Sequence, residues 1–564
     1  MTADGEKADG LSPAHSTQQP AVASPVVPPL PIARLQAPSG DGERLIFPAL
    51  ESLPTMAEQN RLARDRWTAT IFGQPLVDLA QEARRQMLQA AIEYTRQYRD
   101  ISPPSAEQAA HAPLFIGGHQ PQLFHPGVWL KNFVLDELSG RSGGIAVNLV
   151  VDSDAIKSAS LPVLTGSVEH PERVQLEYDA SSPAMAWEDR QVLDADIFQR
   201  FGQRAGEMLR PLVDRPLVDE FWPRVINRAN ATGLIGSAFS QARHQFEADW
   251  ELNTLELPQS VLCNLPAFHT FFAHILANVD RLREVYNRAI ARYRSAHKTR
   301  SATHPAPLLE QVDDWTQIPF WMWSTAESQQ RPQALFAAYR DNFVEVGDRR
   351  ALERSVPDPR RDQLETLQSL SHLEGSGVRL RTKALMTTLF ARVFLGDLFV
   401  HGLGGAKYDE VTDEIIREFY GVDPPHYAIA TGTLRLPIDR PAVSIGDLNL
   451  SAQTQWSLLH HPESFVHEST CSDNVRQLIA DKRRWVAKPI ELGNERERCQ
   501  AIRRINESLQ SSVDEVRQRA LMEKRQLEQR WRNEQLLGWR EYPFAWYPRK
   551  TLENFLLAIR HRTL

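Results

Sequence analysis

The chain has 564 residues, more than one ordinary hydrophobic core holds, so we expect two or three domains. Its 64 basic and 71 acidic residues give a net charge of -7, and this balance offers no basic excess for nucleic acid. The three cysteines, Cys263, Cys471 and Cys499, are far apart, which argues against a disulfide framework and a cysteine-based metal site. The composition is therefore typical of a soluble globular protein in a reducing compartment.

Targeting and membrane signals are not visible in the sequence. At the N-terminus no basic region is followed by an apolar run, so we expect no secretory signal. The longest apolar stretch, residues 384–405, contains Arg392, Asp397 and His401 and therefore predicts a buried core helix instead of a membrane span. We expect a cytoplasmic protein that binds neither nucleic acid nor membrane.

The N-terminal part of the chain changes from low complexity to a helical pattern. Residues 1–45 are rich in Pro, Ala, Ser and Gly and cannot bury enough apolar surface to offset their ordering entropy, which predicts a disordered tail. A helical stretch over about residues 56–98 follows, and Pro103 and Pro104 close it.

A strand–helix–strand unit comes next. An apolar strand begins at Leu114, a helix begins at Pro126 and can end at Gly140, and a second apolar strand covers residues 145–151. Two apolar strands joined by a helix are expected to lie parallel, with both faces of the sheet covered. Shorter strands are predicted around residues 163–164 and 173–178.

Later segments alternate between helical and mixed patterns. Residues 194–297 have helical periodicity, 319–323 return to strand character, and 380–400 are predicted to form a central helix that is apolar on nearly all sides. A glycine turn then precedes a helix over residues 409–420, which is expected to stop at Gly421.

The last part of the chain predicts paired helices. Apolar residues from Ile502 to Trp531 mark one seam of a long charged helix, and residues 448–486 could supply its antiparallel partner across residues 489–494. An intramolecular hairpin and a homodimer through these helices would satisfy the same seam.

The fold class that follows is α/β, with a Rossmann-like parallel sheet core, a helical insertion and a C-terminal helical hairpin or coiled coil. The predicted parts are the disordered tail (1–45), the first part of the core (46–190), the helical insertion (191–300), the second part of the core with the glycine-turn helix (301–445) and the C-terminal hairpin or coiled coil (446–564).

The first candidate site is the loop after the first predicted strand. Parallel strands deliver the residues that follow them to one edge of the sheet, where open α/β folds bind ligands. Gly118, His119, Gln120 and His125 lie in this loop, which could wrap a phosphate or carboxylate at the start of the next helix. The alternative is a tight turn whose polar residues cap that helix.

The second candidate site is the acidic pair Asp152 and Asp154 after the second strand. Two carboxylates at a strand end could hold a divalent cation, anchor an amine or hydroxyl, or act as a base. The alternative is a pair of solvated caps in a loop.

The third candidate is the glycine turn that begins at His401. Gly404 and Gly405 would let the backbone approach a ligand, and Lys407 could neutralise an anion, as could Arg381 before the apolar helix. Acidic residues at the start of the following helix would repel a phosphate, so a structural glycine break is the alternative.

The order of these motifs resembles a known family. Residues 118–124, Gly-His-Gln-Pro-Gln-Leu-Phe, are similar to the GQQxGLF segment of the bacillithiol-biosynthesis cysteine-adding enzymes. Asp152-Ser-Asp154 resembles the family's acidic DHD motif, and Gly404, Gly405 and Tyr408 resemble its GGPxExxY segment. A C-terminal coiled-coil arm is also a family feature.

The resemblance implies a Rossmann-like core related to HIGH-motif nucleotidyltransferases and an activity that joins cysteine to glucosaminyl-malate. The chain departs from the family pattern at four places: His119 replaces a Gln, Pro126-Gly127 reverses a Gly-Pro order, Ser153 replaces a His, and Phe133 stands where a lysine is expected, with Lys131 nearby. These departures leave the substrate open.

We therefore expect a ligase-type enzyme that joins an amine-bearing small molecule to a carboxyl- or sugar-bearing acceptor, in low-molecular-weight thiol or related metabolism. The cofactor stays open, with ATP or ADP as the nucleotide to test, and no metal ligands are assigned. A non-catalytic coiled-coil interaction protein and a metal-dependent hydrolase are the alternatives. The candidate catalytic residues are His119, His125, Asp152 and Asp154, and the candidate substrate-binding residues are Gly118, Gln120, Arg381, His401, Gly404, Gly405, Lys407 and Tyr408.

Overall fold

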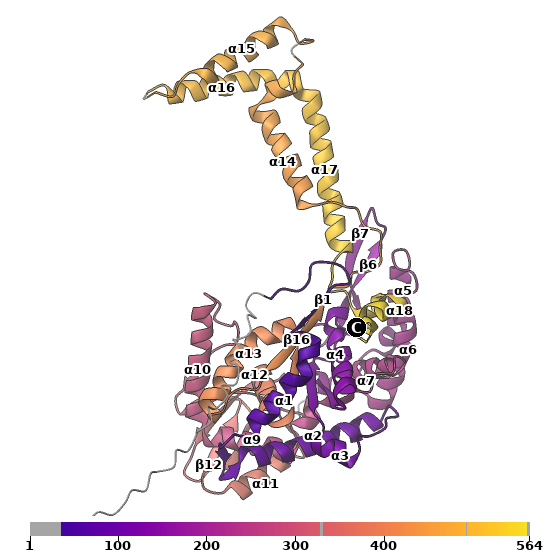
Figure 1. The fold of residues 1–564 in the computed structure, drawn as a ribbon, viewed down its shortest axis with the longest axis vertical. Helices are drawn as coiled ribbons and strands as arrows, with labels where there is room; N and C mark the ends of the chain where they lie inside the picture. The colour runs from indigo at the N-terminus through magenta and orange to yellow at the C-terminus, as the bar shows by residue number, and fades with distance from the viewer. Residues whose placement is uncertain (1–34, 327–330, 468, 492, 561–564) are drawn as a thin grey trace, which may run out of the picture. The chain divides into compact units, whose positions relative to one another are not determined.

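The computed structural model describes residues 35–326, 331–467, 469–491 and 493–560 (Figure 1). Most of the predicted disordered tail, residues 1–34, lies outside the described residues. The end of that predicted tail is ordered, because strand β1 (Arg44–Phe47) belongs to the central sheet.

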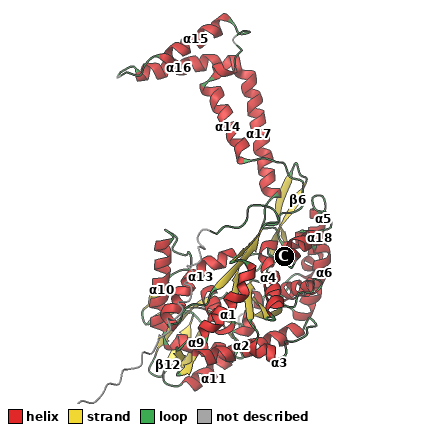
Figure 2. Cartoon of the chain, in the orientation of Figure 1, coloured by secondary structure: helices red, strands yellow, loops and turns green. Residues whose placement is uncertain are grey.

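The central sheet has 6 strands in the order β1-β16-β15-β4-β5-β8. Figure 2 shows strands, in yellow, surrounded by helices, in red. The parallel strands are β4 (Leu114–His119), β5 (Ile145–Val150), β8 (Leu255–Pro258), β15 (Leu398–His401) and β16 (Tyr427–Gly432), and β1 is antiparallel to β16. The chain adds β5 and β8 on one side of β4, and then β15 and β16 on the other side. The direction of winding therefore reverses between β4 and β15.

The strand–helix–strand unit forms as the sequence predicts. β4 and β5 pair in parallel, with Leu114 opposite Ile145 and Gly118 opposite Leu149, and every residue of β5 is buried. Helix α4 (Pro126–Ser142) connects them, and it ends at Gly143 in the left-handed region (φ 61°) instead of at Gly140.

Helices cover both faces of the central sheet. α4 packs against β4, β5, β15 and β16, and its Leu135 side chain lies over Gly117. The other face is covered by α2 (Leu76–Arg96), which packs against β8 and against the π-helical segment Ala391–Leu395. A parallel sheet buried on both faces explains why its strands carry continuous apolar runs.

The predicted helical stretch over residues 56–98 contains a break. It consists of α1 (Leu53–Arg64) and α2, which are separated by the short hairpin β2 (Thr70–Ile71) and β3 (Gln74–Pro75). A short helix, α3 (Ala106–His111), follows α2.

The predicted insertion over residues 191–300 is mainly helical but includes a strand of the central sheet. Its helices are α5 (Ala195–Leu209), α6 (Val218–Thr232), α7 (Ile235–Ala248), α8 (Gln259–Leu262), α9 (Pro266–Ala277) and α10 (Val279–Ala296). Strand β8 lies between α7 and α8 and pairs with β5. The hairpin β6 (Ser160–Gly166) and β7 (Pro171–Glu177) precedes these helices and confirms the two short strands predicted there.

A second, antiparallel sheet replaces part of the predicted second half of the core. Its order is β13-β12-β11-β10-β14, with β9 paired to β10. Its elements are β9 (Gln311–Val312), β10 (Trp315–Ser324), β11 (Gln333–Tyr339), β12 (Phe343–Gly347), β13 (Glu353–Pro357) and β14 (Val378–Thr382), and α11 (Gln363–Leu373) lies between β13 and β14.

The prediction of one apolar helix over residues 380–400 is wrong. β14 ends at Thr382, α12 (Ala384–Phe390) and the π-helical segment follow, and β15 begins at Leu398. Apolar composition alone does not separate a buried helix from a buried strand. Within the described residues, no helix has both the length and the apolar character needed to cross a bilayer.

The C-terminal helices form two antiparallel pairs where one hairpin was predicted. α14 (Ile445–His460) packs against α17 (Asp514–Leu537), and α15 (Asp473–Ala487) packs against α16 (Glu495–Leu509) (Figure 1). A 3-10 turn, Gln510–Val513, interrupts the predicted long helix between α16 and α17.

The end of the chain is part of the core, although the sequence predicted an arm as far as residue 564. Phe544, Trp546, Tyr547 and the helix α18 (Arg549–Leu556) are in the main hydrophobic cluster. The Phe544 backbone amide donates to the carbonyl of Phe124 at 2.8 Å, directly before α4.

Asp397 joins four elements at the amino-terminal edge of the central sheet. It accepts hydrogen bonds from Arg64 on α1 (2.8 Å), from Arg84 on α2 (2.8 and 2.9 Å) and from the Leu114 amide at the start of β4 (2.8 Å). Burial opposes ionisation of Asp397, but Arg84 and Arg64 outweigh it and lower the pKa of the carboxyl below its usual 3.8.

Replacing Asp397 with Asn should lower the free energy of unfolding by about 3–5 kcal/mol at pH 7, because the buried Arg64 and the half-buried Arg84 lose their counter-charge. The native pKa is depressed, so the stabilisation is complete above pH 3.8 and is lost as the pH falls through the lower folded pKa. Urea unfolding of both proteins between pH 3 and 8 measures this. An equal difference in stability at pH 3 and pH 8 would contradict the assignment.

Candidate functional site

The parallel register brings the ends of three strands to one edge of the central sheet. Gly117 of β4 lies opposite Asn148 of β5 and Val400 of β15. The loops that follow β4 and β5 are also joined directly, because Gln120 Nε2 donates to Asp154 Oδ2 at 2.5 Å. The first two predicted candidate loops therefore meet.

The hydrogen bond made by His119 shows which of its ring nitrogens carries the proton. Its Nδ1 lies 2.8 Å from the carbonyl oxygen of Gln120 and must donate to it, so Nε2 carries the lone pair. Nε2 is buried without a hydrogen-bond partner among the described residues. Burial, with the charges of Lys131 and Arg243, lowers the pKa of His119 well below 6.5, so the ring is neutral at pH 7.

Lys131 is a functional candidate that the sequence did not single out. Its Nζ donates to the carbonyl oxygen of Gly118 at 2.7 Å from within α4. Burial, together with the charge of Arg243, lowers the pKa of Lys131 to about 7. The sequence signal was its place two residues before Phe133, where the resembled family has a lysine. A buried amine that is partly neutral at pH 7 can accept a proton or act as a nucleophile.

His125 caps a helix, which was the alternative reading of this histidine. It is the N-cap residue of α4, and its Nδ1 accepts a hydrogen bond from the Gly127 amide at 3.1 Å. Burial, with the charges of Arg540 and Lys131, lowers the pKa of His125 to about 4. A catalytic role for His125 stays a prediction.

Asp152 has a structural role in joining two strand ends. Its Oδ1 accepts from the Ser260 amide at 2.9 Å, and its Oδ2 accepts from the Ser260 hydroxyl at 2.5 Å. Ser260 is in α8, directly after β8, and Asp152 is buried. Because both carboxylate oxygens are engaged, Asp152 holds the end of β5 to the end of β8.

Asp154 lines a cavity between the central sheet and the second sheet. The cavity has a volume of about 620 Å³ and is lined by Ser153, Asp154, Ala155, Trp321, Arg331, Pro332, Gln333, Ala334 and Arg350. Burial raises the pKa of the Asp154 carboxyl, and the hydrogen bond from Gln120 opposes this shift. One carboxylate and two guanidinium groups thus border the same space.

Arg381, a predicted anion ligand, is buried and its donors are already used. Its Nε and Nη2 form a bidentate pair with Glu188 at 2.9 and 2.7 Å. Its Nη1 donates to Glu374 at 3.2 Å and to the carbonyl of Leu380 at 3.0 Å. Nη2 also donates to Glu374 at 3.2 Å, so every N–H group of Arg381 is engaged within the protein, and the arginine holds β14 to the segment after β7.

His401 forms a buried pair with Asp409. Its Nε2 lies 2.7 Å from Asp409 Oδ2, and Arg392 Nη1 donates to the same oxygen at 2.8 Å. Burial opposes ionisation of Asp409, but His401 and Arg392 outweigh it and lower the pKa of the carboxyl. The carboxylate thereby fixes the His401 ring at the end of β15.

The glycine turn after β15 begins helix α13 (Leu403–Ile415). Gly404 and Gly405 are exposed, and a Cβ at Gly404 would meet no atom within 4 Å, so its backbone is open to a ligand. Lys407 is half-buried, and the ring of Tyr408 packs against His304 at 5.4 Å. Within the described residues, no hydrogen bond joins this turn to the Gly118 loop or the Asp154 loop.

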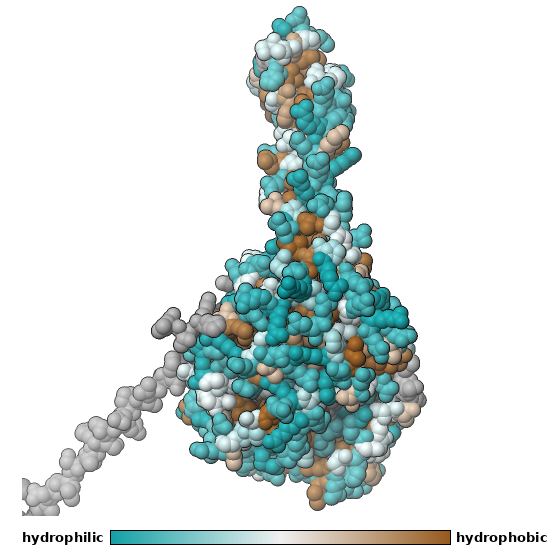
Figure 3. Space-filling model, turned by 90° about the vertical axis from the view of Figure 1, so that its right-hand side faces the viewer, coloured by the Kyte–Doolittle hydropathy of each residue, from teal (hydrophilic) through white to brown (hydrophobic). Residues whose placement is uncertain are grey.

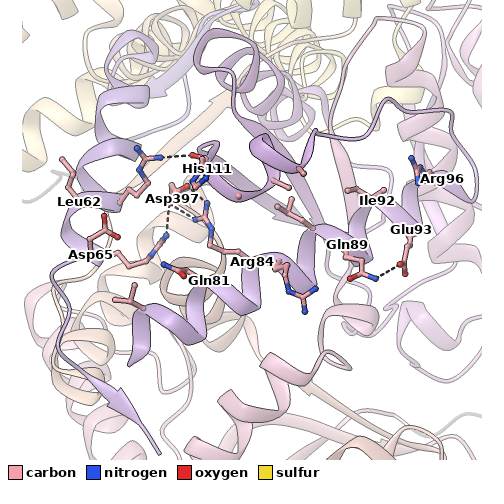
Figure 4. A pocket seen from close by; sticks show the side chains of 18 residues that line it. Leu62, Asp65, Gln81, Arg84, Gln89, Ile92, Glu93, Arg96, His111 and Asp397 are labelled. Carbon is pink, nitrogen blue, oxygen red and sulfur yellow. Dashed lines mark hydrogen bonds and ion pairs between the residues drawn. The ribbon is translucent and has the colours of Figure 1, made fainter. Parts of the chain in front are cut away.

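A larger cavity lies at the opposite, amino-terminal edge of the sheet. It has a volume of about 1110 Å³ and is lined by residues of α1, α2 and α3 together with Asp397 (Figure 4). Its arginines largely pair with neighbours, as Arg84 does with Asp397 and Arg85 with Glu82. Parallel α/β sheets bind ligands at the carboxyl edge, so the Asp154 cavity is the stronger candidate despite its smaller volume.

The chain was compared with protein-family models and with curated proteins. No protein-family model matches the chain, and no curated protein matches it. The resemblance to the cysteine-adding enzymes therefore stays a prediction. Within the part of the chain that the structure describes, no group of three His, Cys, Asp or Glu side chains is placed to hold a metal ion.

Substituting Ala for the buried Asp152 should lower the free energy of unfolding by about 1–3 kcal/mol, because the half-buried Ser260 amide and hydroxyl lose their acceptors. The matched variant Asp154→Ala loses one hydrogen bond at a half-buried position and should cost about 1 kcal/mol or less. Chemical denaturation of both variants measures the difference. Equal stability of the two variants would show that Asp152 has no holding role.

Proposed function

We propose that the chain is a Rossmann-like, ligase-type enzyme that joins an amine-bearing small molecule of the cysteine type to a carboxyl- or sugar-bearing acceptor. The observation that carries this proposal is the cavity at the carboxyl edge of the sheet, bordered by Asp154, Arg331 and Arg350. A carboxylate complements the ammonium group of an amino acid, and a guanidinium group complements its carboxylate.

The order of the strands supports the Rossmann-like part of the proposal. The five parallel strands, numbered along the chain, take the spatial order 3-2-1-4-5. Sheets of this kind bind ligands outside the carboxyl ends of the strands, at the point where the order reverses. Here that point lies between β4 and β15, next to the Gly118 loop.

Two neutral or partly neutral bases support amine chemistry at this edge. An amine must lose a proton before it attacks an acyl or sugar carbon, so a base near neutral pKa is required. Lys131, with a pKa of about 7, is the better matched base, whereas the pKa of His119 lies well below 6.5. Lys131 donates to Gly118 and so lies directly below the loop that would contact the substrate.

The start of α13 suits the anionic part of an adenine nucleotide, which would supply the activation that condensation of an amine with a carboxylate needs. The open backbone at Gly404 leaves room for such a group. The acidic residues near this turn were expected to repel it. Arg392 already pairs with Asp409 and Asp413, which removes most of that repulsion.

The non-catalytic alternative is supported by apolar side chains on the surface of the C-terminal helices (Figure 3). Ile445, Leu450, Trp456 and Leu459 of α14 are all more than half exposed. A partner protein or a second copy of the chain could cover them. The hydrolase alternative is not favoured, because His125 Nδ1 already accepts from the Gly127 amide and both oxygens of Asp152 already accept from Ser260.

Binding of cysteine analogues tests the proposal. Asp154→Asn should weaken binding of L-cysteine and cysteamine by about tenfold or more and leave 3-mercaptopropionate unaffected, because only the amine loses its partner. Arg350→Ala should weaken cysteine and 3-mercaptopropionate but spare cysteamine. Isothermal titration in the presence and absence of ATP measures these affinities.

Arg349→Ala is the matched control, since Arg349 lies over the Phe336 ring and does not line the cavity. If the wild-type protein binds none of the three compounds, with or without ATP, the ligase proposal fails and the interaction protein is favoured.

A further inference from the structure

His401 is the last residue of β15, and its ring is buried and held on both sides. Only 4% of its surface is exposed, and the ring packs against Phe399 at 4.4 Å and Tyr427 at 5.0 Å between centroids. The Tyr427 hydroxyl donates to the carbonyl of Ala406 at 3.1 Å, which ties these rings to α13. The position of the imidazole relative to the glycine turn is therefore fixed.

One ring nitrogen of His401 is paired and the other is not. Nε2 donates to Asp409 Oδ2 at 2.7 Å, and the Thr388 hydroxyl donates to the other carboxylate oxygen at 2.8 Å. Nδ1 has no hydrogen-bond partner among the described residues, but it is not sealed from solvent as Nε2 of His119 is. An unpaired nitrogen on a buried side chain indicates a partner that comes from outside the protein.

The unpaired Nδ1 faces the first turn of α13. A Cβ built on Gly405 would lie 2.9 Å from Nδ1, and apart from α13 itself the three atoms nearest to that Cβ all belong to His401. Gly405 is exposed, so this place is open and the imidazole forms its inner wall. A ligand atom there would lie within hydrogen-bonding distance of Nδ1.

The same turn provides backbone donors. The amides of Leu403, Gly404 and Gly405 begin α13 and have no hydrogen-bond partner in the described structure. The first hydrogen bond of the helix runs from the Ala406 amide to the carbonyl of Gly402 at 3.1 Å, and no side chain caps this end. Amides at a helix start bind oxyanions, and an imidazolium beside them adds a charged donor.

The acidic residues near the turn are already paired. Asp409 accepts from Arg392 at 2.8 Å in addition to His401. Glu410 lies 2.7 Å from His297 Nε2. These cations offset the carboxylates, so an anion at the start of α13 is not met by unpaired negative charge.

We infer that His401, as an imidazolium held by Asp409, binds a phosphoryl group at the start of α13 through Nδ1, together with the amides of residues 403–405. In this state the ring donates from Nε2 to Asp409 and from Nδ1 to the ligand, so both nitrogens are satisfied. The inference specifies the anion site of the proposed function and rests on its nucleotide part. The phosphoryl group belongs to a nucleotide or to another phosphate compound.

Isothermal titration of the full chain with tripolyphosphate, ATP and adenosine at constant ionic strength tests the inference. The wild-type protein should bind tripolyphosphate and ATP, and His401→Gln should weaken both by about tenfold or more, because the charged donor is lost. Gly405→Ala puts a methyl group beside Nδ1, where the ligand would lie, and should have a similar effect. This second variant decides the test if His401→Gln does not fold. Tighter binding of ATP than of tripolyphosphate, with measurable binding of adenosine, identifies the ligand as a nucleotide.

Gly140→Ala in α4 is the matched control, since a Cβ at Gly140 would meet no atom within 4 Å, and it should bind both compounds like the wild type. Melting curves without ligand show whether each variant is folded. If the wild type binds ATP and both variants bind it equally well, the inference is overturned and the nucleotide proposal stands. If the wild type binds neither tripolyphosphate nor ATP, both fail. Binding of tripolyphosphate that depends on His401, in a protein that does not bind cysteine, supports the inference and removes the ligase.

Discussion

The parallel pairing of β4 with β5 and β15 determines where every candidate residue lies. Asp397 holds the start of β4 against α1 and α2 at one edge, so the register of the strands fixes what emerges at the other edge. Gly117 lies opposite both Asn148 and Val400, and the loops that follow are brought within hydrogen-bonding distance, as Gln120 and Asp154 show. The candidate site is a consequence of this strand pairing.

Burial separates the charged groups that hold the fold from those that face a cavity. Arg381 with Glu188, and Arg392 with Asp409, are buried pairs in which each charge is compensated by its neighbour. Removing one partner from such a pair leaves an unpaired buried charge, which is strongly destabilising. Asp154 differs from these groups, because it is half-buried and borders open space together with exposed arginines.

The sequence predicted the local elements better than their assembly. The strand–helix–strand unit and the positions of its two loops follow from periodicity and glycine turns, and the structure contains them. Strands Leu255–Pro258 and Leu398–His401 were missed because each has only four residues, too few to show a period. Asp152 joins β5 to β8 by accepting from Ser260, and Arg381 uses its donors on Glu188. Both partners are distant in the chain, so local sequence patterns do not predict these contacts.

The central claim is that ligands bind at the carboxyl edge of the central sheet, where the β4 and β5 loops face the second sheet. Hydrogen–deuterium exchange with and without cysteine plus ATP tests it most directly, since binding slows exchange at the contacted backbone. The account predicts joint protection of residues 118–125, 152–156 and 331–350. Protection confined to the groove between α1, α2 and α3 would contradict it.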